Sequence, residues 1–366
     1  MKQYKPDEIY IDSQVINSEY TIQIQNKFPT ITPTIIEKKD EKVDLFSRLS
    51  LTRGKKVLYL KPFQGNAFKL CPGFSDDLLC CNYYVIDLIE NCPLECTYCI
   101  LQAFLNKPVI TFHVNVEQIL ADITTAVKES PKQPFRIGTG EHSDSLALDH
   151  IFEVNPRLVE LFSGFPNAIL ELKTKTDAIE PLLGLNHKGR TVVAWSLNPP
   201  EIIRQNEFKT ASLDQRLTAA KKLVDDGYKV AFHFDPIIYY PGWKEGYFQT
   251  VENLLDNIPS DKIAWISLGT LRYTNSLKQI AEQRFSNLSI FCNEFIPAED
   301  GKMKYQKSIR KELLDSLAGW ISELAPQIPL YFCMEKRSIW QSTFLNPPAD
   351  SNALEAYLDV NCRFKR

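Results

Sequence analysis

An alternation of short apolar runs and amphipathic runs, which begins near residue 84, constrains the fold most. Runs rich in Val, Ile and aromatic residues predict strands at 84–90, 135–140, 168–176, 191–198, 229–238 and 263–269. The amphipathic runs between them predict helices at 116–130, 155–164, 212–227 and 246–258. Such alternation is typical of βαβ units and a parallel sheet. The sequence therefore predicts an α/β fold built as an open or partial barrel.

Polar residues follow the ends of these predicted strands. In folds of this kind the chemistry gathers at the carboxyl ends of the strands. The groups found there are Cys92, Cys96 and Cys99 after the first strand, "GTGEHSDS" (138–145) after the second, Lys175 after the third, Ser196 and Asn198 after the fourth, and His233 and Asp235 on the fifth. We expect them to converge on one site.

The first of these groups is the stretch "NCPLECTYCIL" (91–101), which holds three cysteines in a C-x3-C-x2-C pattern. Zinc in a structural site normally takes four protein ligands. Three thiolates without a neighbouring histidine instead suit an iron–sulfur cluster, and three ligands on a four-iron cluster leave one iron open. The competing interpretation is three buried, unreactive thiols. We favour the cluster, because core cysteines have no reason to gather just past a strand end.

Composition narrows the class of protein. The chain has 366 residues, 9 of them Cys, with a net charge of -3 and a pI near 6.0. This cysteine usage does not fit a small secreted disulfide scaffold. The N-terminal residues lack an apolar signal region, and no apolar run is long enough to cross a bilayer. We expect a cytoplasmic protein without an overall basic coat for nucleic acid, although a local basic patch is still compatible with the charge.

The cysteine motif directly after a first strand resembles the radical S-adenosylmethionine (radical SAM) superfamily, and further pieces resemble its spore photoproduct lyase branch. These pieces are "CTYCILQAFLNKPVITFHVN" (96–115), "SDSLALDH" (143–150), "LKTKTD" (172–177), "WSLNPPEI" (195–202), "RLTAAKKLVDDGY" (216–228) and "GWKEGY" (242–247). The resemblance covers most of the chain. It implies a partial (β/α)6 radical SAM barrel at 84–275, an N-terminal α/β extension at 1–83 and a C-terminal hairpin and helical region at 276–366, packed as one compact unit.

The resemblance also implies the cofactors. Cys92, Cys96 and Cys99 would hold a 4Fe–4S cluster whose open iron chelates the methionine part of SAM. One electron would then cleave SAM and release a 5′-deoxyadenosyl radical, so that the cofactor carries the difficult chemistry and the protein orients it. The residues that the resemblance places around SAM are Tyr98, Gly138, Gly140, Glu141, Ser143, Lys175, Ser196 and Asn198. The implied contacts are the ammonium for Glu141, the carboxylate for Ser143 and Lys175, and the ribose for Ser196 and Asn198.

In the lyases the radical takes a hydrogen atom from a thymine dimer in DNA, the dimer splits, and a cysteine returns hydrogen with the help of a tyrosine. By our alignment Glu141 stands where that cysteine is expected. A carboxylate has no weak X–H bond to offer a carbon radical. Several explanations stay open: Cys80 or Cys81 replaces the donor, Tyr98 or SAM turnover closes the cycle, or the substrate is different. Tyr98, Glu141 and Cys81 are the candidate catalytic residues.

Two further groups have a functional and a structural interpretation. Cys71, Cys80 and Cys81 are either a hydrogen donor or auxiliary ligand, or buried thiols near the mouth of the site, which we favour. His233 and Asp235 alternate with apolar residues and so share the inward face of a strand. They are either a core pair or contacts to cofactor or substrate.

The basic stretch "EDGKMKYQKSIRK" (299–311) matches the position of a DNA-contacting hairpin in the lyases. Basic residues with an aromatic suit phosphates and a stacked base, although such runs are more often solvated surface. The candidate DNA contacts are Lys302, Lys304, Tyr305, Lys307 and Arg310.

We expect an electron donor such as flavodoxin or ferredoxin, a monomer, and no membrane partner. Three hypotheses stay open: a DNA lesion lyase, a radical SAM enzyme on RNA, peptide or a small molecule, and a non-catalytic Fe–S nucleic-acid-binding protein.

Overall fold

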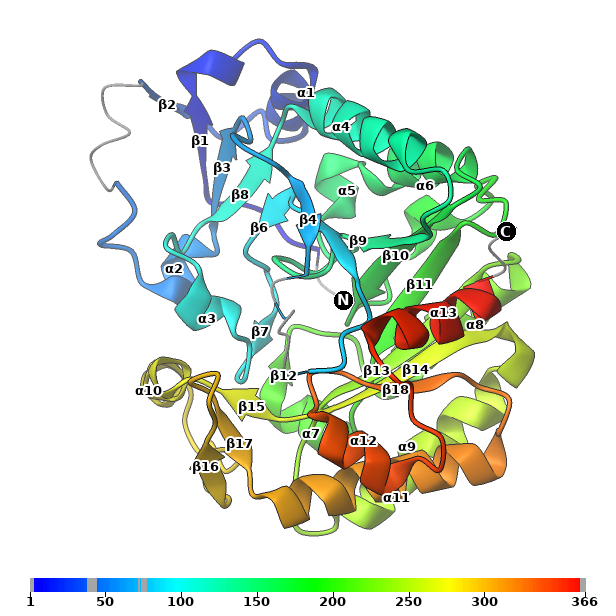
Figure 1. The fold of residues 1–366 in the computed structure, drawn as a ribbon. Helices are drawn as coiled ribbons and strands as arrows, with labels where there is room; N and C mark the ends of the chain where they lie inside the picture. Colours follow the sequence, from blue (N-terminus) through cyan, green and yellow to red (C-terminus); the bar gives the residue numbers. More distant parts are fainter. Residues whose placement is uncertain (1–2, 38–44, 72, 74–77, 363–366) are drawn as a thin grey trace.

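The computed structural model describes residues 3–37, 45–71, 73 and 78–362, and its main layer is an eight-stranded sheet that curls into a half-barrel (Figure 1). The strand order is β18 (Leu330–Phe332), β14 (Ile263–Thr270), β13 (Lys229–Ile237), β11 (Thr191–Ser196), β10 (Ala168–Thr174), β9 (Phe135–Gly138), β5 (Tyr84–Ile86) and β4 (Phe68–Leu70). Neighbouring strands are parallel except for β4 and β5. The predicted α/β partial barrel is confirmed.

Helices on the outside of the curled sheet connect its strands (Figure 1). They are α4 (Val116–Glu129), α6 (Asn155–Ser163), α8 (Leu213–Asp225), α9 (Trp243–Asn257) and α11 (Lys307–Leu324). The four predicted helices are confirmed to within a few residues. Ser212 and Gln215 form the expected capping box, in which each side chain bonds the backbone of the other residue. With the helices on one face, the other face of the sheet is left to line the lumen of the half-barrel.

A second sheet lies at the N-terminal side, in the order β2 (Thr34–Ile36), β1 (Glu8–Asp12), β3 (Val57–Lys61), β8 (Ile110–His113) and β6 (Ile89–Glu90). The helical elements of this part are η1 (Ser13–Val15), α1 (Glu19–Lys27) and α2 (Leu51–Gly54). Because β6 and β8 come from beyond residue 84, this sheet draws on both sides of the expected boundary. One continuous apolar core nevertheless joins the two sheets, from Ile9 and Ile11 on β1 to Ile237 on β13.

The C-terminal part contains the expected hairpin and helical region. Strands β15 (Arg272–Tyr273), β17 (Met303–Tyr305) and β16 (Phe295–Pro297) form a small antiparallel sheet. The helices after β14 are α10 (Asn275–Arg284), α11, α12 (Arg337–Thr343) and α13 (Ser351–Cys362). Strand β18 returns to the half-barrel. Among the described residues, no helix combines the length and the apolar character needed to span a bilayer.

Short elements at the strand ends complete the fold. They are β7 (Glu95–Cys96), α3 (Leu101–Phe104), α5 (Asp149–Phe152), η2 (Glu180–Leu182), α7 (Pro200–Asn206), β12 (Glu207–Phe208) and η3 (Ser260–Lys262). Of these, β7, α3, α7 and β12 surround the cysteine motif and position the candidate site.

Candidate functional site

The three motif cysteines lie on the loop between β6 and α3. The loop begins at Asn91, which has a positive φ of 69° and a buried side chain. This side chain donates to the carbonyl of Pro108 at 2.7 Å and accepts from the backbone N–H of Cys92 at 2.8 Å. Cys92 and Cys96 are buried and Cys99 is partly exposed. The loop is therefore fixed at its start and presents its thiols at the carboxyl end of the half-barrel.

The donor set fits an iron–sulfur cluster better than a single metal ion. In the described part of the chain, no group of three His, Cys, Asp or Glu side chains converges on one ion position. A four-iron cluster has no such requirement, because each thiolate binds a different iron. Burial raises the pKa of Cys92 to about 12 and raises that of Cys96 well above its usual range. Both thiols therefore carry protons that cluster binding would displace.

The segment α7–β12 clamps the second half of the motif. Strand β12 pairs antiparallel with β7, and this places Glu207 opposite Cys96. The neighbouring residue Thr97 donates its backbone N–H to the carbonyl of Asn206 at 2.9 Å and its hydroxyl to the Asn206 side chain at 3.0 Å. Residues that are more than 100 positions apart in the chain thereby hold the backbone between Cys96 and Cys99.

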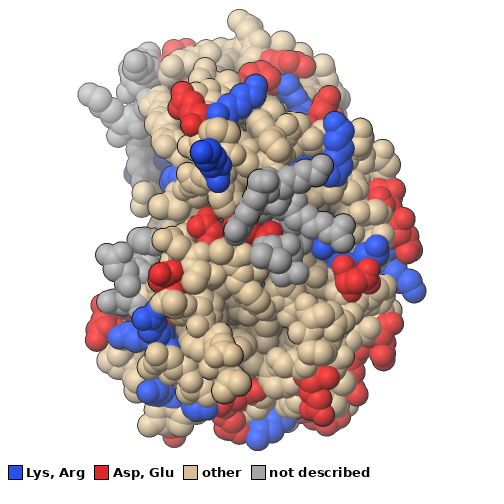
Figure 2. All heavy atoms as spheres, turned by 45° about the vertical axis from the view of Figure 1, so that its right-hand side comes forward, with Lys and Arg blue, Asp and Glu red and all other residues tan. Residues whose placement is uncertain are grey.

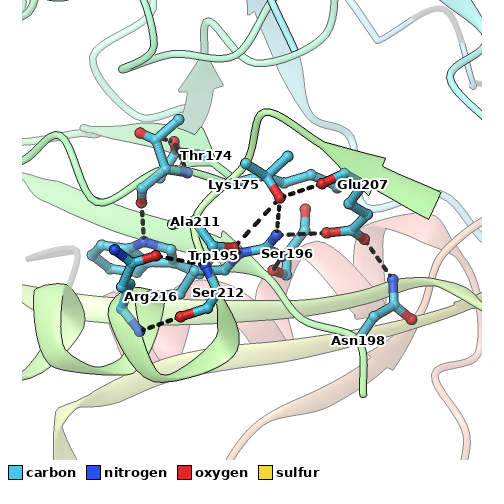
Figure 3. A network of polar contacts seen from close by, with 12 residues as sticks. Thr174, Lys175, Trp195, Ser196, Asn198, Glu207, Ala211, Ser212 and Arg216 are labelled. Atoms are coloured by element: carbon cyan, nitrogen blue, oxygen red, sulfur yellow. Dashed lines mark hydrogen bonds and ion pairs between the residues drawn. The ribbon is translucent and has the colours of Figure 1, made fainter. Parts of the chain in front are cut away.

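Glu207 is the centre of a buried polar network next to the motif (Figure 3). Its carboxylate accepts a hydrogen bond from the Tyr98 hydroxyl, one from the Asn198 amide at 2.9 Å, and a charged one from Arg216 at 2.6 Å. Burial would raise the pKa of Glu207, but the charges of Arg216 and of Lys175 outweigh it and lower the pKa to about 2. The carboxylate is therefore ionised and fixes the ring of Tyr98.

Arg216 anchors this network on helix α8. Its guanidinium also donates to the carbonyls of Ser196 at 2.8 Å and Ala211 at 3.0 Å, and its side chain is fully buried (Figure 3).

Sequence reasoning missed both Glu207 and Arg216. One signal was present, because Arg216 occupies an apolar position of α8 between Leu213 and Leu217. A charge on the buried stripe of a helix calls for a buried partner.

The turn after β9 holds several of the expected cofactor contacts. Asp144 accepts from the hydroxyl of Thr174 at 2.8 Å and from the backbone N–H of Lys175 at 2.7 Å, so it ties this turn to the end of β10. The Lys175 ammonium lies 5.9 Å from the centre of the Tyr98 ring. Ser143 is buried, and its hydroxyl has no hydrogen-bond partner among the described residues. The Lys175 ammonium thus lies close to the motif tyrosine, and the turn tied to it carries a buried hydroxyl without a partner in the described chain.

The two glycines of this turn are tightly packed by the chain itself. A Cβ on Gly138 would lie 1.6 Å from the hydroxyl of Tyr83, and one on Gly140 would lie 2.9 Å from the Cβ of Lys173. The close approach expected of a cofactor at these glycines is thus made by protein side chains. A role for them in SAM binding stays a prediction.

Ser196 and Asn198 lie at the end of β11 as expected, and Figure 3 shows them beside Glu207. The carbonyl of Ser196 binds Arg216, while the Ser196 side chain is buried. The Asn198 side chain donates to Glu207 and accepts from the Tyr247 hydroxyl at 2.7 Å. Asn198 therefore connects the motif network to helix α9, and its contact with a ribose stays a prediction.

His233 and Asp235 point into the lumen, but they do not pair with each other. His233 contacts Glu171 on β10 at 2.6 Å and Ser267 on β14 at 2.5 Å. Asp235 instead forms a two-pronged ion pair with Arg272 at 3.1 and 3.2 Å. The alternative of a His–Asp core pair is therefore wrong, because each residue has a partner on a neighbouring strand or just beyond it.

Glu141 follows β9, and the candidate cysteines Cys80 and Cys81 precede β5, the strand that pairs with β9. The Glu141 carboxylate lies 3.8 Å from the Lys173 ammonium. Cys81 is partly exposed, and its carbonyl accepts from Arg136 on β9. A hydrogen bond from Cys80, together with the charge of Arg136, lowers the pKa of Cys81 to about 6 against the effect of burial. Cys80 correspondingly has a raised pKa, because its hydrogen bond favours the protonated thiol.

The predicted DNA contacts are only partly accessible. Tyr305 is fully buried, and its hydroxyl accepts the backbone N–H of Tyr239 at 3.0 Å, so the expectation that it stacks on a base does not fit this structure. Lys304 is buried against Asp300 at 3.0 Å, and Arg310 is paired with Glu335 at 3.1 Å. The accessible candidates are Lys302, which is half-buried, and Lys307, which is exposed.

Charged groups on the face seen in Figure 2 lie mainly around its rim, with Lys and Arg interspersed among Asp and Glu. Below the centre of this face lies a largely uncharged area. Among the described residues on this side, no continuous basic stripe crosses the surface. A nucleic acid bound to this face would therefore rely on a few local cations rather than on a broad positive surface.

Comparisons with known proteins agree with this geometry. The protein-family model described as spore photoproduct lyase matches residues 76–332. The spore photoproduct lyase of Geobacillus sp. (strain Y412MC61) is 27% identical over 258 residues, which cover 68% of this chain and 76% of that protein. The spore photoproduct lyase of Bacillus subtilis (strain 168) is 29% identical over 258 residues, which cover 68% and 75%.

Solved structures of spore photoproduct lyases are also similar to this chain. A spore photoproduct lyase complexed with dinucleoside spore photoproduct superposes with a TM-score of 0.77 at 25% identity, and the match covers 90% of this chain and 99% of that chain. A doubly substituted variant of spore photoproduct lyase, with bound AdoMet and dinucleoside spore photoproduct, has a TM-score of 0.78 at the same identity and coverage.

Proposed function

The chain belongs to the spore photoproduct lyase family of radical SAM lyases, and from this premise we propose that it splits a thymine-dimer lesion, the spore photoproduct, in DNA. One observation carries the proposal. The cysteine loop, on which Glu207 fixes Tyr98, packs through Cys92 against Ala147 of the segment after β9, and this segment also carries the unsatisfied Ser143 hydroxyl. A solved relative of this fold binds AdoMet and the dinucleoside lesion together. The position is where α/β barrels place their chemistry.

Cys92, Cys96 and Cys99 would hold the 4Fe–4S cluster, since they form a compact set of thiols on a fixed loop. When bound and reduced, the cluster supplies the electron that cleaves SAM into a hydrogen-abstracting species. An electron donor of the flavodoxin or ferredoxin class would supply that electron. The role left to the protein is to orient cofactor and lesion and to exclude water.

The chain's own residues can orient the methionine end of SAM. The buried hydroxyl of Ser143 has no partner within the described chain and gains one if it donates to the methionine carboxylate. The Lys175 ammonium, near the Tyr98 ring, adds a charge that complements the carboxylate. Glu207 holds Tyr98 in place through its hydroxyl, so the ring presents a fixed wall to the cofactor.

The lumen is the proposed binding site for the lesion. Glu141, Lys173, Glu171 with His233, and Asp235 with Arg272 give it a polar lining that can bind the hydrogen-bonding edges of the two thymines. An enzyme acting on a base within DNA takes that base out of the stack, and a damaged base costs less to extrude. Lys302 and Lys307 are the accessible cations that we propose for the flanking phosphates.

The test is an anaerobic assay of the protein reconstituted with iron and sulfide. We expect 5′-deoxyadenosine to form at least ten times faster with the dinucleotide spore photoproduct than with undamaged thymidylyl-thymidine. Cys92→Ala should bind less iron and form no deoxyadenosine, whereas Cys292→Ala, at an exposed position outside the site, should behave like the wild type. Deoxyadenosine formation that ignores the lesion would contradict the proposed substrate and favour a different one accommodated by Glu141.

A further inference from the structure

Splitting the lesion leaves a carbon radical that must receive a hydrogen atom, and the structure offers a donor other than the residue at position 141. The inference about this donor rests on the proposed function. Glu141 faces the lumen, but its carboxylate is ion-paired with Lys173 and has no weak bond to hydrogen. A thiol has such a bond. The question is which cysteine presents a thiol to the lumen.

Four cysteines outside the motif gather near one rim of the half-barrel. They are Cys71, Cys80, Cys81 and Cys333. The rim is closed where the segment before β5 runs beside the segment after β18, with a bridge between Leu78 and Lys336. No three acidic, histidine or cysteine side chains in the described chain converge as a metal site. These cysteines are also free rather than disulfide-bonded. They are therefore available as thiols.

Strand geometry places Cys333 on the lumen face. Tyr331 on β18 is paired in register with Ser267 on β14, whose hydroxyl contacts His233 in the lumen. Side chains alternate along a strand, so a residue two positions after Tyr331 returns to the same face. The backbone N–H of Cys333 continues the ladder by donating to the carbonyl of Leu268 at 2.8 Å. Cys333 therefore lies on the same face of the sheet as Ser267 and His233.

Arg272 fixes the Cys333 thiol in position. Its guanidinium lies 3.8 Å from the Cys333 sulfur and 3.2 Å from the Met334 sulfur. Asp235 in turn holds the guanidinium at two points. The absence of a side chain at Gly269 makes room for this pair, since a Cβ there would lie 2.8 Å from the Asp235 carboxyl carbon. The thiol is thus part of an ordered arrangement.

Lys173 connects this arrangement to position 141. Burial alone would lower the pKa of its ammonium, but surrounding acidic groups raise it well above the usual range. These groups, in decreasing order, are Glu141, Glu171, Asp235 and Cys333. Lys173 therefore contacts Glu141, at 3.8 Å, and also interacts electrostatically with Cys333.

The protonation state separates Cys333 from its neighbour. Burial and the charge of Asp235 raise the pKa of Cys333 well above its usual range, so its S–H bond is intact at neutral pH. Cys81 has a lowered pKa of about 6 and is a thiolate at neutral pH, without a hydrogen atom to give. Cys71 and Cys80 also have raised pKa values and keep their S–H bonds. What distinguishes Cys333 is its place on the same strand face as Tyr331, beside Ser267, where Arg272 holds its sulfur.

We propose that Cys333 donates the hydrogen atom to the carbon radical left after the lesion is split. In this step the S–H bond breaks homolytically, a C–H bond forms on the thymine, and the sulfur becomes a thiyl radical. One electron from a carrier of the class that reduces the cluster, together with a proton from solvent, restores the thiol. Atoms and electrons then balance over the cycle.

Isotope transfer tests the proposal. The thiol hydrogen exchanges with solvent, so in D2O the wild type should place one deuterium on the product thymine. Cys333→Ala and the isosteric Cys333→Ser should still cleave SAM in response to the lesion, but form repaired product at least ten times more slowly and with less than a fifth of the deuterium. Cys292→Ala serves as the matched control and should resemble the wild type. Glu141→Cys in the Cys333→Ser background should restore both repair and deuterium transfer.

A second readout does not need the cluster or SAM. In the apoprotein, the dinucleotide lesion should slow alkylation of Cys333 by N-ethylmaleimide at least five-fold, while alkylation of Cys292 stays unchanged. Wild-type rate and deuterium content in both Cys333 variants would overturn the inference, as would alkylation of Cys333 that ignores bound lesion. A wild-type enzyme that neither cleaves SAM nor repairs the lesion would instead refute the proposed function.

Discussion

Replacement of Glu207 by Gln tests the network that holds the cysteine motif. The Glu207–Arg216 pair is fully buried at 2.6 Å. Glutamine keeps the shape of the side chain, but it removes the charge opposite Arg216. Removing one partner of a buried ion pair typically costs about 3–5 kcal/mol, because the remaining charge is left unpaired in the interior. We expect Glu207→Gln to lower the free energy of unfolding by this amount.

The pKa of Glu207 gives an independent value for the stability that its ionised carboxylate contributes. The pKa is 4.5 for an unperturbed glutamate and about 2 in the folded protein. At about 1.4 kcal/mol per pH unit, this difference corresponds to about 3 kcal/mol of stability at neutral pH. A carboxyl group with a lowered folded pKa stabilises above its unfolded pKa. The contribution is therefore complete above pH 5 and is lost as the pH falls from about 4.5 toward 2.

The assay is urea unfolding of the apoprotein, followed by circular dichroism at pH 7 and at several values down to pH 3.5. Glu201→Gln is the matched control, because Glu201 lies on the same α7–β12 segment but is exposed, and it should change stability by less than about 0.5 kcal/mol. The double variant Glu207→Gln with Arg216→Gln should lose less than the sum of the two single variants. A loss below about 1 kcal/mol in Glu207→Gln would refute the reasoning.

Three further predictions concern other parts of the molecule. Gly138→Ala should lower the free energy of unfolding, measured in urea, by about 3 kcal/mol, because its Cβ would meet a buried tyrosine hydroxyl at 1.6 Å. The control Gly319→Ala has open space around its Cβ in helix α11 and should leave the free energy of unfolding unchanged or raise it by up to about 1 kcal/mol. Burial raises the pKa of Asp149 from 3.8 to about 6, so the folded protein loses stability as the pH rises through this range and Asp149 ionises. Asp149→Asn should therefore raise the free energy of unfolding at pH 7 by up to about 3 kcal/mol and remove this pH dependence. Lys302→Ala with Lys307→Ala should weaken binding of lesion-containing duplex and reduce the slope of log K against log salt by about 1–2, as measured by fluorescence anisotropy; an unchanged slope would exclude both lysines as phosphate contacts.

The sequence was informative about the fold because the central barrel strands are buried on both faces. Largely apolar runs such as β11 and β14 are then visible without an alignment. The exception is the run 84–90, which divides into β5 in the barrel and β6 in the N-terminal sheet. Asp87 lies between them, buried and bound to Lys69 at 2.5 Å. A local apolar pattern does not reveal which of two sheets a strand joins.

The site was predictable where it lies on strand ends and unpredictable where it depends on long-range packing. Lys175 was found from its position after a strand and Tyr98 from the family resemblance, and the two do lie together. Glu207 was missed because its place opposite Cys96 depends on a two-residue strand pairing across more than 100 positions. Tyr305 was misjudged because three residues of strand are too few to show which face is buried. Charge and aromaticity suggested DNA, whereas the fold uses that ring in its core.

The most direct test of the central claim follows the lesion itself. The reconstituted, reduced protein is incubated with SAM and a synthetic DNA duplex that contains one spore photoproduct, and the digested DNA is analysed by mass spectrometry. The account predicts loss of the lesion and recovery of two thymidines per lesion, dependent on SAM and abolished in Cys92→Ala. An intact lesion, from a protein that holds its cluster and cleaves SAM, would contradict the proposed repair of DNA.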